Sequence, residues 1–161
     1  MKLDTNNMNT ADEKLVKVLH SKSSSLYRFI SLYNTFMNKP KDYGTGELIN
    51  MVEIHILTEI EENPGTSVTE LARIWNKTKG AISQTVTKLE KKGYITREKR
   101  EGNDKNILLF ATQEGIELSK AHKLYDSKDL IDTLNYLMKR CTLDEIEGFY
   151  KVLNEYIKLL E

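Results

Sequence analysis

Apolar residues recur at three- and four-residue spacing through most of the chain, the spacing that places them on one face of an α-helix. The pattern stops at turn-forming sequences such as Asn38-Lys39-Pro40 and Asn63-Pro64-Gly65, where proline and glycine end a helix. It predicts six helices, at residues 10–37, 47–62, 67–76, 78–92, 112–138 and 142–160, the fifth with a break near Asp126. Residues 41–46 are expected to form a loop.

Capping sequences mark the ends of several predicted helices. Ser67 and Thr142 are each followed three residues later by a glutamate, which is the capping-box spacing, and Thr78 is a candidate N-cap. Gly93 stands where a left-handed residue would end the fourth helix.

Beyond Gly93 the helical spacing gives way to two short β-prone runs. They cover residues 94–98 and 107–112, and a basic, turn-rich segment separates them. Helix, short turn, helix and hairpin make a winged helix-turn-helix. The predicted fold class is therefore mainly α, an α+β winged helix of six helices with a two-stranded β-hairpin as its wing.

The fourth predicted helix has two unlike faces. Ile82, Val86 and Leu89 form an apolar stripe, whereas the opposite face carries small, hydrogen-bonding and basic residues. Such a face suits a DNA groove, where amide, hydroxyl and ammonium groups pair with base edges and phosphates.

Charge is unevenly distributed along the chain. The 161 residues balance at 24 basic and 24 acidic, yet from Lys77 to Lys105 nine Lys and Arg stand against four Asp and Glu. This local excess of positive charge predicts a nucleic-acid surface that the whole-chain sum hides.

The motif order SVTELARIWNKTKGAISQTVTKLEKKGYITREKREGNDKN…ATQEG resembles the DNA-binding core of the MarR family of bacterial transcriptional regulators. The segment LEKKGYI and the T-x-x-G at Thr112 are typical of that family, and the resemblance spans roughly residues 47–122. Two positions depart from the family pattern. Asn106 stands where the wing usually carries an arginine, and Ala111 stands where leucine usually precedes the threonine.

The resemblance implies a regulator that binds double-stranded DNA, with base contacts from Lys79, Ser83, Gln84 and Thr87. The remaining candidates are expected to reach phosphates or the minor groove, and Asp104 is expected to pair with Arg97 and hold the wing's shape. The full set of expected DNA-binding residues is Ser67, Thr69, Thr78, Lys79, Gly80, Ser83, Gln84, Thr87, Lys88, Lys91, Lys99, Arg100, Asn103 and Lys105.

The chain is expected to be a single domain, residues 1–161, with a DNA-binding lobe at 47–112. The helical segments 10–40 and 113–161 are expected to form a dimerisation region, because the last helix carries a long apolar stripe. A two-fold dimer would present two recognition helices to a palindromic operator. The alternative is that the stripe folds back onto the first helix of the same chain.

The sequence suggests three hypotheses for how DNA binding is regulated. A small-molecule effector would bind in a pocket lined by Tyr27, Tyr33, Phe36, Tyr43, His55 and Trp75. A metal response would use His55 and His122, although Glu53 and His55 fall on different faces of a helix and no paired-histidine motif is present, so no metal ligand is assigned. A redox response would use Cys141.

The remaining sequence features exclude several classes of protein. One cysteine fits a reducing cytosol, and no signal peptide or membrane-length apolar run is present, so a cytoplasmic protein without a membrane role is expected. No nucleophile elbow or phosphate-binding glycine loop points to an enzyme or to a cofactor. A winged-helix protein-interaction module without a DNA role is the alternative function.

Overall fold

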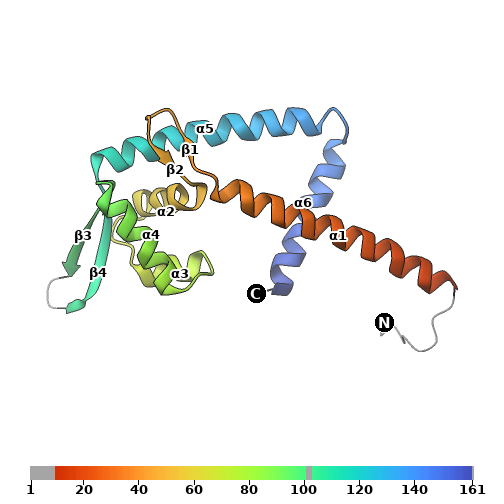
Figure 1. The fold of residues 1–161 in the computed structure, drawn as a ribbon, viewed down its shortest axis with the longest axis horizontal. Helices are drawn as coiled ribbons and strands as arrows, with labels where there is room; N and C mark the ends of the chain where they lie inside the picture. Colours follow the sequence, from red (N-terminus) through yellow and green to blue (C-terminus); the bar gives the residue numbers. More distant parts are fainter. Residues whose placement is uncertain (1–9, 101–102, 161) are drawn as a thin grey trace.

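The computed structural model describes residues 10–100 and 103–160, without the side chains of residues 10–12, 15, 19, 100 and 103–106. A small lobe and two long helices extending from it make up the molecule, and α6 returns from the far end of α5 toward α1 (Figure 1). The elements in chain order are α1 (Thr10–Asn38), β1 (Lys41–Asp42), β2 (Leu48–Ile49), α2 (Met51–Glu62), α3 (Val68–Ile74), α4 (Lys79–Lys91), β3 (Ile95–Arg100), β4 (Asn103–Ala111), α5 (Gln113–Leu137) and α6 (Leu143–Leu160). The predicted fold class is confirmed.

The hydrophobic core lies almost entirely in the lobe. Ile54, Leu57 and Ile60 of α2 are fully buried, and they pack with the apolar stripe of α4, Ile82, Val86 and Leu89, which is also fully buried. The helical spacing read from the sequence thus marks the inward faces of these two helices.

The second helix begins later than the sequence predicts. Asn50 caps α2, since its side chain accepts a hydrogen bond of 2.8 Å from the backbone N–H of Glu53. Leu48, which falls within the predicted helix 47–62, lies in β2 and is 63% exposed. Lys41 and Asp42 of the expected loop form strand β1, and residues 43–46 lie in the loop of the β1–β2 hairpin. Asp42 Oδ1 closes this loop by accepting hydrogen bonds from the N–H groups of residues 44–46.

The helix-turn-helix has the predicted caps. Ser67 and Glu70 form a reciprocal capping box at the start of α3, and Thr78 caps α4 by accepting from the N–H of Ala81. Asn76 in the turn has a φ of 45°, a left-handed conformation that asparagine tolerates better than most residues. Ile74, at the end of α3 next to this turn, is 49% exposed.

The wing is an antiparallel pair of strands that starts directly after α4. β3 pairs with β4 from Ile95 opposite Ala111, and the register shifts between Lys99 and Arg100. Gly65 and Thr66 add backbone hydrogen bonds to Leu109, at 2.8 and 2.9 Å, so the segment before α3 braces the wing.

The long helices α1, α5 and α6 leave much apolar surface uncovered. α5 is continuous to Leu137, so the predicted break near Asp126 is wrong. Leu124 of α5 is 75% exposed, and Ile146 is the one residue of α6 with a buried side chain among those described. No helix within the described ranges is long and apolar enough to cross a lipid bilayer.

Candidate nucleic-acid interface and regulatory sites

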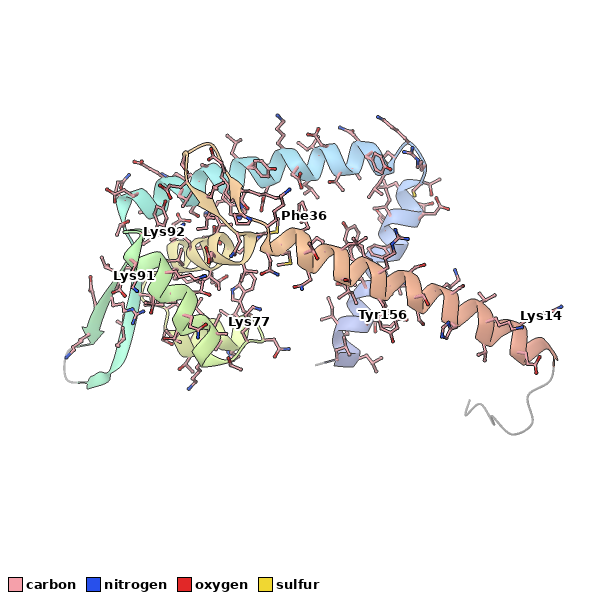
Figure 2. The ribbon with its side chains drawn as sticks, in the orientation of Figure 1. Lys14, Phe36, Lys77, Lys91, Lys92 and Tyr156 are labelled. Atoms are coloured by element: carbon pink, nitrogen blue, oxygen red, sulfur yellow. The ribbon has the colours of Figure 1, made fainter. Side chains whose placement is uncertain are left out.

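A groove of about 840 Å³ lies where the start of α3, the start of α4 and the wing meet. Its α4 wall carries the predicted DNA-binding residues Lys79, Gly80 and Ser83, and its α3 wall carries Ser67 and Thr69. The basic residues Lys91 and Lys92 lie at the other end of α4, beside the wing (Figure 2). The groove therefore brings together predicted DNA-binding residues from the starts of α3 and α4.

Some of the predicted DNA-binding side chains are exposed to solvent, whereas others already form hydrogen bonds that cap helices. Lys79, Gln84 and Lys91 are exposed. Ser67 is engaged in the capping box, where its backbone N–H donates to Glu70 Oε2 at 2.8 Å, and Thr78 Oγ1 caps α4. Capping also lowers the pKa of the Glu70 carboxyl, because the Ser67 hydroxyl and then its N–H donate to it.

Lys88 forms an ion pair with Glu53 of α2, with a distance of 3.1 Å between Nζ and Oε1. Sequence reasoning assigned Lys88 to a phosphate without detecting this partner, because the two residues are 35 positions apart. The pair connects the recognition helix to α2.

Arg97 anchors the wing on the recognition helix. Its Nη2 donates a hydrogen bond of 2.8 Å to Thr87 Oγ1, and its Nε lies 3.1 Å from Glu90 Oε2. The expected wing-structural role of Arg97 thus involves partners on α4. Thr87, expected at a base edge, is half-buried and accepts from Arg97. The side chains of Arg100, Asn103, Asp104 and Lys105 lie outside those described, and so does any Arg97–Asp104 pair.

A second cavity, of about 760 Å³, lies between the lobe and the long helices and is lined by α1, α2, α5, α6 and the turn before α6. Of the predicted effector-pocket residues, Tyr33, Phe36 and His55 line it. Tyr27 does not, and its side chain is 71% exposed. Cys141 is half-buried and also lines this cavity.

Tyr43 and Trp75, the remaining pocket candidates, lie behind the cavity wall. Tyr43 is buried with its ring edge-on to His122 and Tyr125, and burial, reinforced by the charge of Asp126, raises the pKa of its hydroxyl to about 12. Trp75 lies against His55, with 6.0 Å between ring centroids.

His55, His122 and Asp126 form a cluster whose nitrogen and oxygen atoms all lie within 4.8 Å of one another. His122 Nε2 is 3.4 Å from His55 Nδ1, and Asp126 lies 3.3 Å from His122 Nδ1 and 3.8 Å from His55 Nε2. His122 is buried, and this desolvation lowers its pKa although the carboxylate of Asp126 opposes the shift. His55 is half-buried and faces both of these partners. Asp126 was not predicted as a member of this cluster, although the i, i+4 spacing of His122 and Asp126 is a signal that could have identified it.

The family model described as MarR family matches residues 49–107. YhjH of Bacillus subtilis (strain 168), described as an uncharacterized HTH-type transcriptional regulator, is 32% identical over 87 residues. That alignment covers 54% of this chain and 50% of YhjH, so the chain spans about half the length of the curated relative it matches.

Solved structures share the fold over most of the chain. Streptococcus pneumoniae FabT, solved in complex with DNA, matches with a TM-score of 0.64 at 18% identity, covering 90% of this chain and 96% of FabT. Lactococcus lactis ZitR, a zinc-responsive MarR family member, matches with a TM-score of 0.66 at 18% identity, covering 86% of this chain and 99% of ZitR. At these identities the likeness establishes the fold.

Proposed function

Because the chain belongs to the MarR family of winged helix-turn-helix transcriptional regulators, we propose that it binds a palindromic DNA operator as a homodimer and acts as a repressor. The observation that carries this proposal is the groove at the starts of α3 and α4, where Lys79, Gly80 and Ser83 stand on the outer face of a helix that leads into the wing. FabT, which shares the fold, has been solved with DNA bound.

The exposed face of α4 has the chemistry for reading bases. Gln84 offers an amide that pairs with adenine, and Lys79 an ammonium that pairs with guanine. Gly80 leaves room for close approach, because nothing lies within 4 Å of the position its Cβ would occupy. We expect Lys91, Lys99 and Thr69 to supply contacts to phosphate. Arg100, Asn103 and Lys105 are expected, from the sequence alone, to contact the backbone or the minor groove.

Homodimerisation is supported by the apolar surface of the three long helices. A soluble monomer rarely leaves this much contiguous apolar surface in water. The residues concerned do not line the cavity described above, are exposed by more than a third of their surface, and include Ile30, Leu32, Ile131, Leu134, Val152, Tyr156, Ile157, Leu159 and Leu160. A second copy covering these faces would bring two α4 helices to half-sites about one DNA turn apart.

The test is selection from a random duplex library with purified protein at about 150 mM salt, near physiological ionic strength. We expect an enriched inverted repeat. Gln84→Ala should then relax the preference at one position of each half-site by about 1–3 kcal/mol, whereas Lys91→Ala should weaken all duplexes alike. Absence of enrichment, with only weak binding that falls steeply with salt, would favour the protein-interaction module.

Release by a small-molecule effector is the second part of the proposal. The cavity joins α2 of the lobe to α1, α5 and α6, so a ligand there contacts both the DNA-binding and the dimerisation helices. A ligand with different affinities for two arrangements of these helices shifts the population between them, and DNA affinity with it. Titrating the selected operator with and without ligand measures this coupling.

A response to a divalent metal is a second candidate function, favoured by the His55, His122 and Asp126 cluster. Two imidazoles and a carboxylate are a donor set that Zn²⁺ accepts, with a fourth position left for another ligand. His122 Nδ1 is buried and faces Asp126 Oδ1 at 3.3 Å without the geometry of a hydrogen bond, so both atoms are placed as neighbouring donors to a metal ion. The zinc response of ZitR, a fold relative, agrees with this reading.

Calorimetry with zinc and a competing chelator tests the metal site. We expect His122→Ala to abolish binding and His20→Ala to leave it unchanged, because His20 is exposed on α1 outside the cluster. Equal zinc binding by both variants would place the metal elsewhere.

A further inference from the structure

The cavity between the lobe and the long helices has mostly aromatic and aliphatic walls. Five aromatic side chains line it, three from α1 and two from α6: Phe29, Tyr33, Phe36, Phe149 and Tyr150. Its volume of about 760 Å³ is in the range of cavities that hold drug-sized organic molecules.

All full charges among the lining residues are negative. Asp126 and Asp129 of α5 and Glu145 of α6 line the cavity, and neither Lys nor Arg is among its lining residues in the part of the chain described. Glu145 is held in place by the capping box at the start of α6, where its Oε2 accepts from the Thr142 N–H at 2.8 Å. Three carboxylates beside apolar walls attract a cation and repel an anion, and the low local dielectric strengthens both effects.

One edge of the cavity already holds a cation on an aromatic ring. The ammonium of Lys41 lies 3.5 Å from the centroid of Phe36 and 5.6 Å from that of Tyr125. Lys41 itself is not a lining residue, and its ring contacts include Phe36 but not Phe29, Tyr33, Phe149 or Tyr150, which also line the cavity. Aromatic faces next to carboxylates are the recurrent means by which proteins bind organic ammonium groups.

We propose that this cavity binds a lipophilic organic cation, an aromatic or bulky alkyl molecule carrying a permanent positive charge, and discriminates against lipophilic anions of the same size. If the cation binds here, it is also the effector that alters DNA affinity; this second step rests on the proposed function. The binding itself is independent of DNA and can be measured without it.

Tetraphenylphosphonium and tetraphenylborate provide a matched pair of probes, because they have nearly the same shape and opposite charge. Trp75 is the single tryptophan and lies 6.0 Å from His55, which lines the cavity, so its fluorescence reports occupancy. With the full chain as purified, we expect saturable binding of the phosphonium, confirmed by calorimetry, and about tenfold weaker binding of the borate. Equal or tighter binding of the borate would overturn the proposal.

Three variants locate the site. Asp129→Asn is expected to weaken phosphonium binding about tenfold, and Asp126→Asn to do the same. Asp144→Asn removes the same charge from an exposed residue at the start of α6 that does not line the cavity, and should have no effect. If Asp129→Asn and Asp144→Asn behave alike, the cation binds elsewhere and the proposal is wrong.

Zinc binding, measured without any organic ligand, distinguishes a site for an organic cation from a site for a metal ion. Asp129 is outside the cluster of His55, His122 and Asp126, so Asp129→Asn should weaken the phosphonium and leave zinc binding unchanged. Loss of zinc and phosphonium binding together in this variant would contradict separate recognition of the organic cation.

DNA titrations keep this inference distinct from the proposed function. Phosphonium binding that leaves operator affinity unchanged would overturn the effector role of the cavity but not its preference for a cation. Operator binding by a protein that shows no preference between the two probes would overturn the cation inference alone.

Discussion

Lys88 on the outer side of the recognition helix and Glu53 on α2 form an ion pair of 3.1 Å. The two ends are unequally solvated, since the side chain of Lys88 is 66% exposed and that of Glu53 only 11%. Loss of the ion pair therefore destabilises the nearly buried carboxylate of Glu53 far more than the well-solvated ammonium of Lys88. A Lys88 that turns toward a phosphate leaves a nearly buried negative charge behind.

Lys88→Met tests this dependence. We expect the free energy of unfolding to fall by about 1–2 kcal/mol, because Glu53 loses its partner. Adding Glu53→Gln should restore most of that loss. Lys91→Met, which removes the same charge from an exposed position on α4, is the control and should change stability by less than about 0.5 kcal/mol in urea unfolding. If the double variant is no more stable than Lys88→Met, the pair is not coupled.

Arg97→Lys tests the attachment of the wing to the recognition helix. A lysine cannot contact Thr87 and Glu90 together, as the guanidinium does at 2.8 and 3.1 Å. We expect faster hydrogen exchange in β3 and β4 with exchange in α2 unchanged, and about tenfold weaker operator binding. Arg28→Lys on α1 is the matched control. Faster exchange throughout the lobe would point to lost core stability in place of a loosened wing.

Gly115→Ala tests the contact between α5 and the start of the wing. A Cβ at this position would overlap the carbonyl oxygen of Tyr94, a backbone atom that the adjacent hairpin holds in place. We expect a loss of about 3 kcal/mol or more from this overpacking. Gly148→Ala in α6 meets nothing within 4 Å and should be neutral or stabilising by up to about 1 kcal/mol. Similar melting temperatures for the two variants would refute the close approach.

Glu61 and Lys123 make stability depend on pH. The hydrogen bond from Lys123 holds the pKa of the Glu61 carboxyl below its ordinary value of 4.5. As the pH falls below 4.5, the Glu61 carboxyl of the unfolded chain takes up a proton more readily than that of the folded chain. The stability that the pair contributes is therefore fully present above pH 4.5 and is lost as the pH falls through the lowered pKa of Glu61. Glu61→Gln should remove roughly 0.5–1 kcal/mol at neutral pH and flatten the acid limb of the stability curve. The exposed Glu147→Gln should keep the wild-type curve; identical curves for both variants would count against the pair.

Local signals allowed much of the fold to be predicted. Capping at Ser67, Thr78 and Thr142 depends on residues within four positions, and the structure has each of these caps. The left-handed Gly93, with a φ of 79°, likewise follows from its position after α4. The apolar stripe of α4 is buried because a period of three to four residues needs no knowledge of distant elements.

The remaining features depend on packing between distant segments. His55 and His122 are 67 positions apart, and only the crossing of α2 with α5 brings them together. The partners of Lys88 and Arg97 are likewise set by how α4 lies on α2 and on the wing. The β1–β2 hairpin was missed because its strands have two residues each, too few for an alternating pattern.

We propose that two copies of this chain read one duplex through two α4 helices. Hydroxyl-radical footprinting of the selected operator, with native mass spectrometry of the same complex, measures both the number of bound chains and the positions that they protect. We expect two chains per duplex and two protected tracts on one face, with centres about one helical turn apart. One chain per duplex with a single protected tract would contradict it.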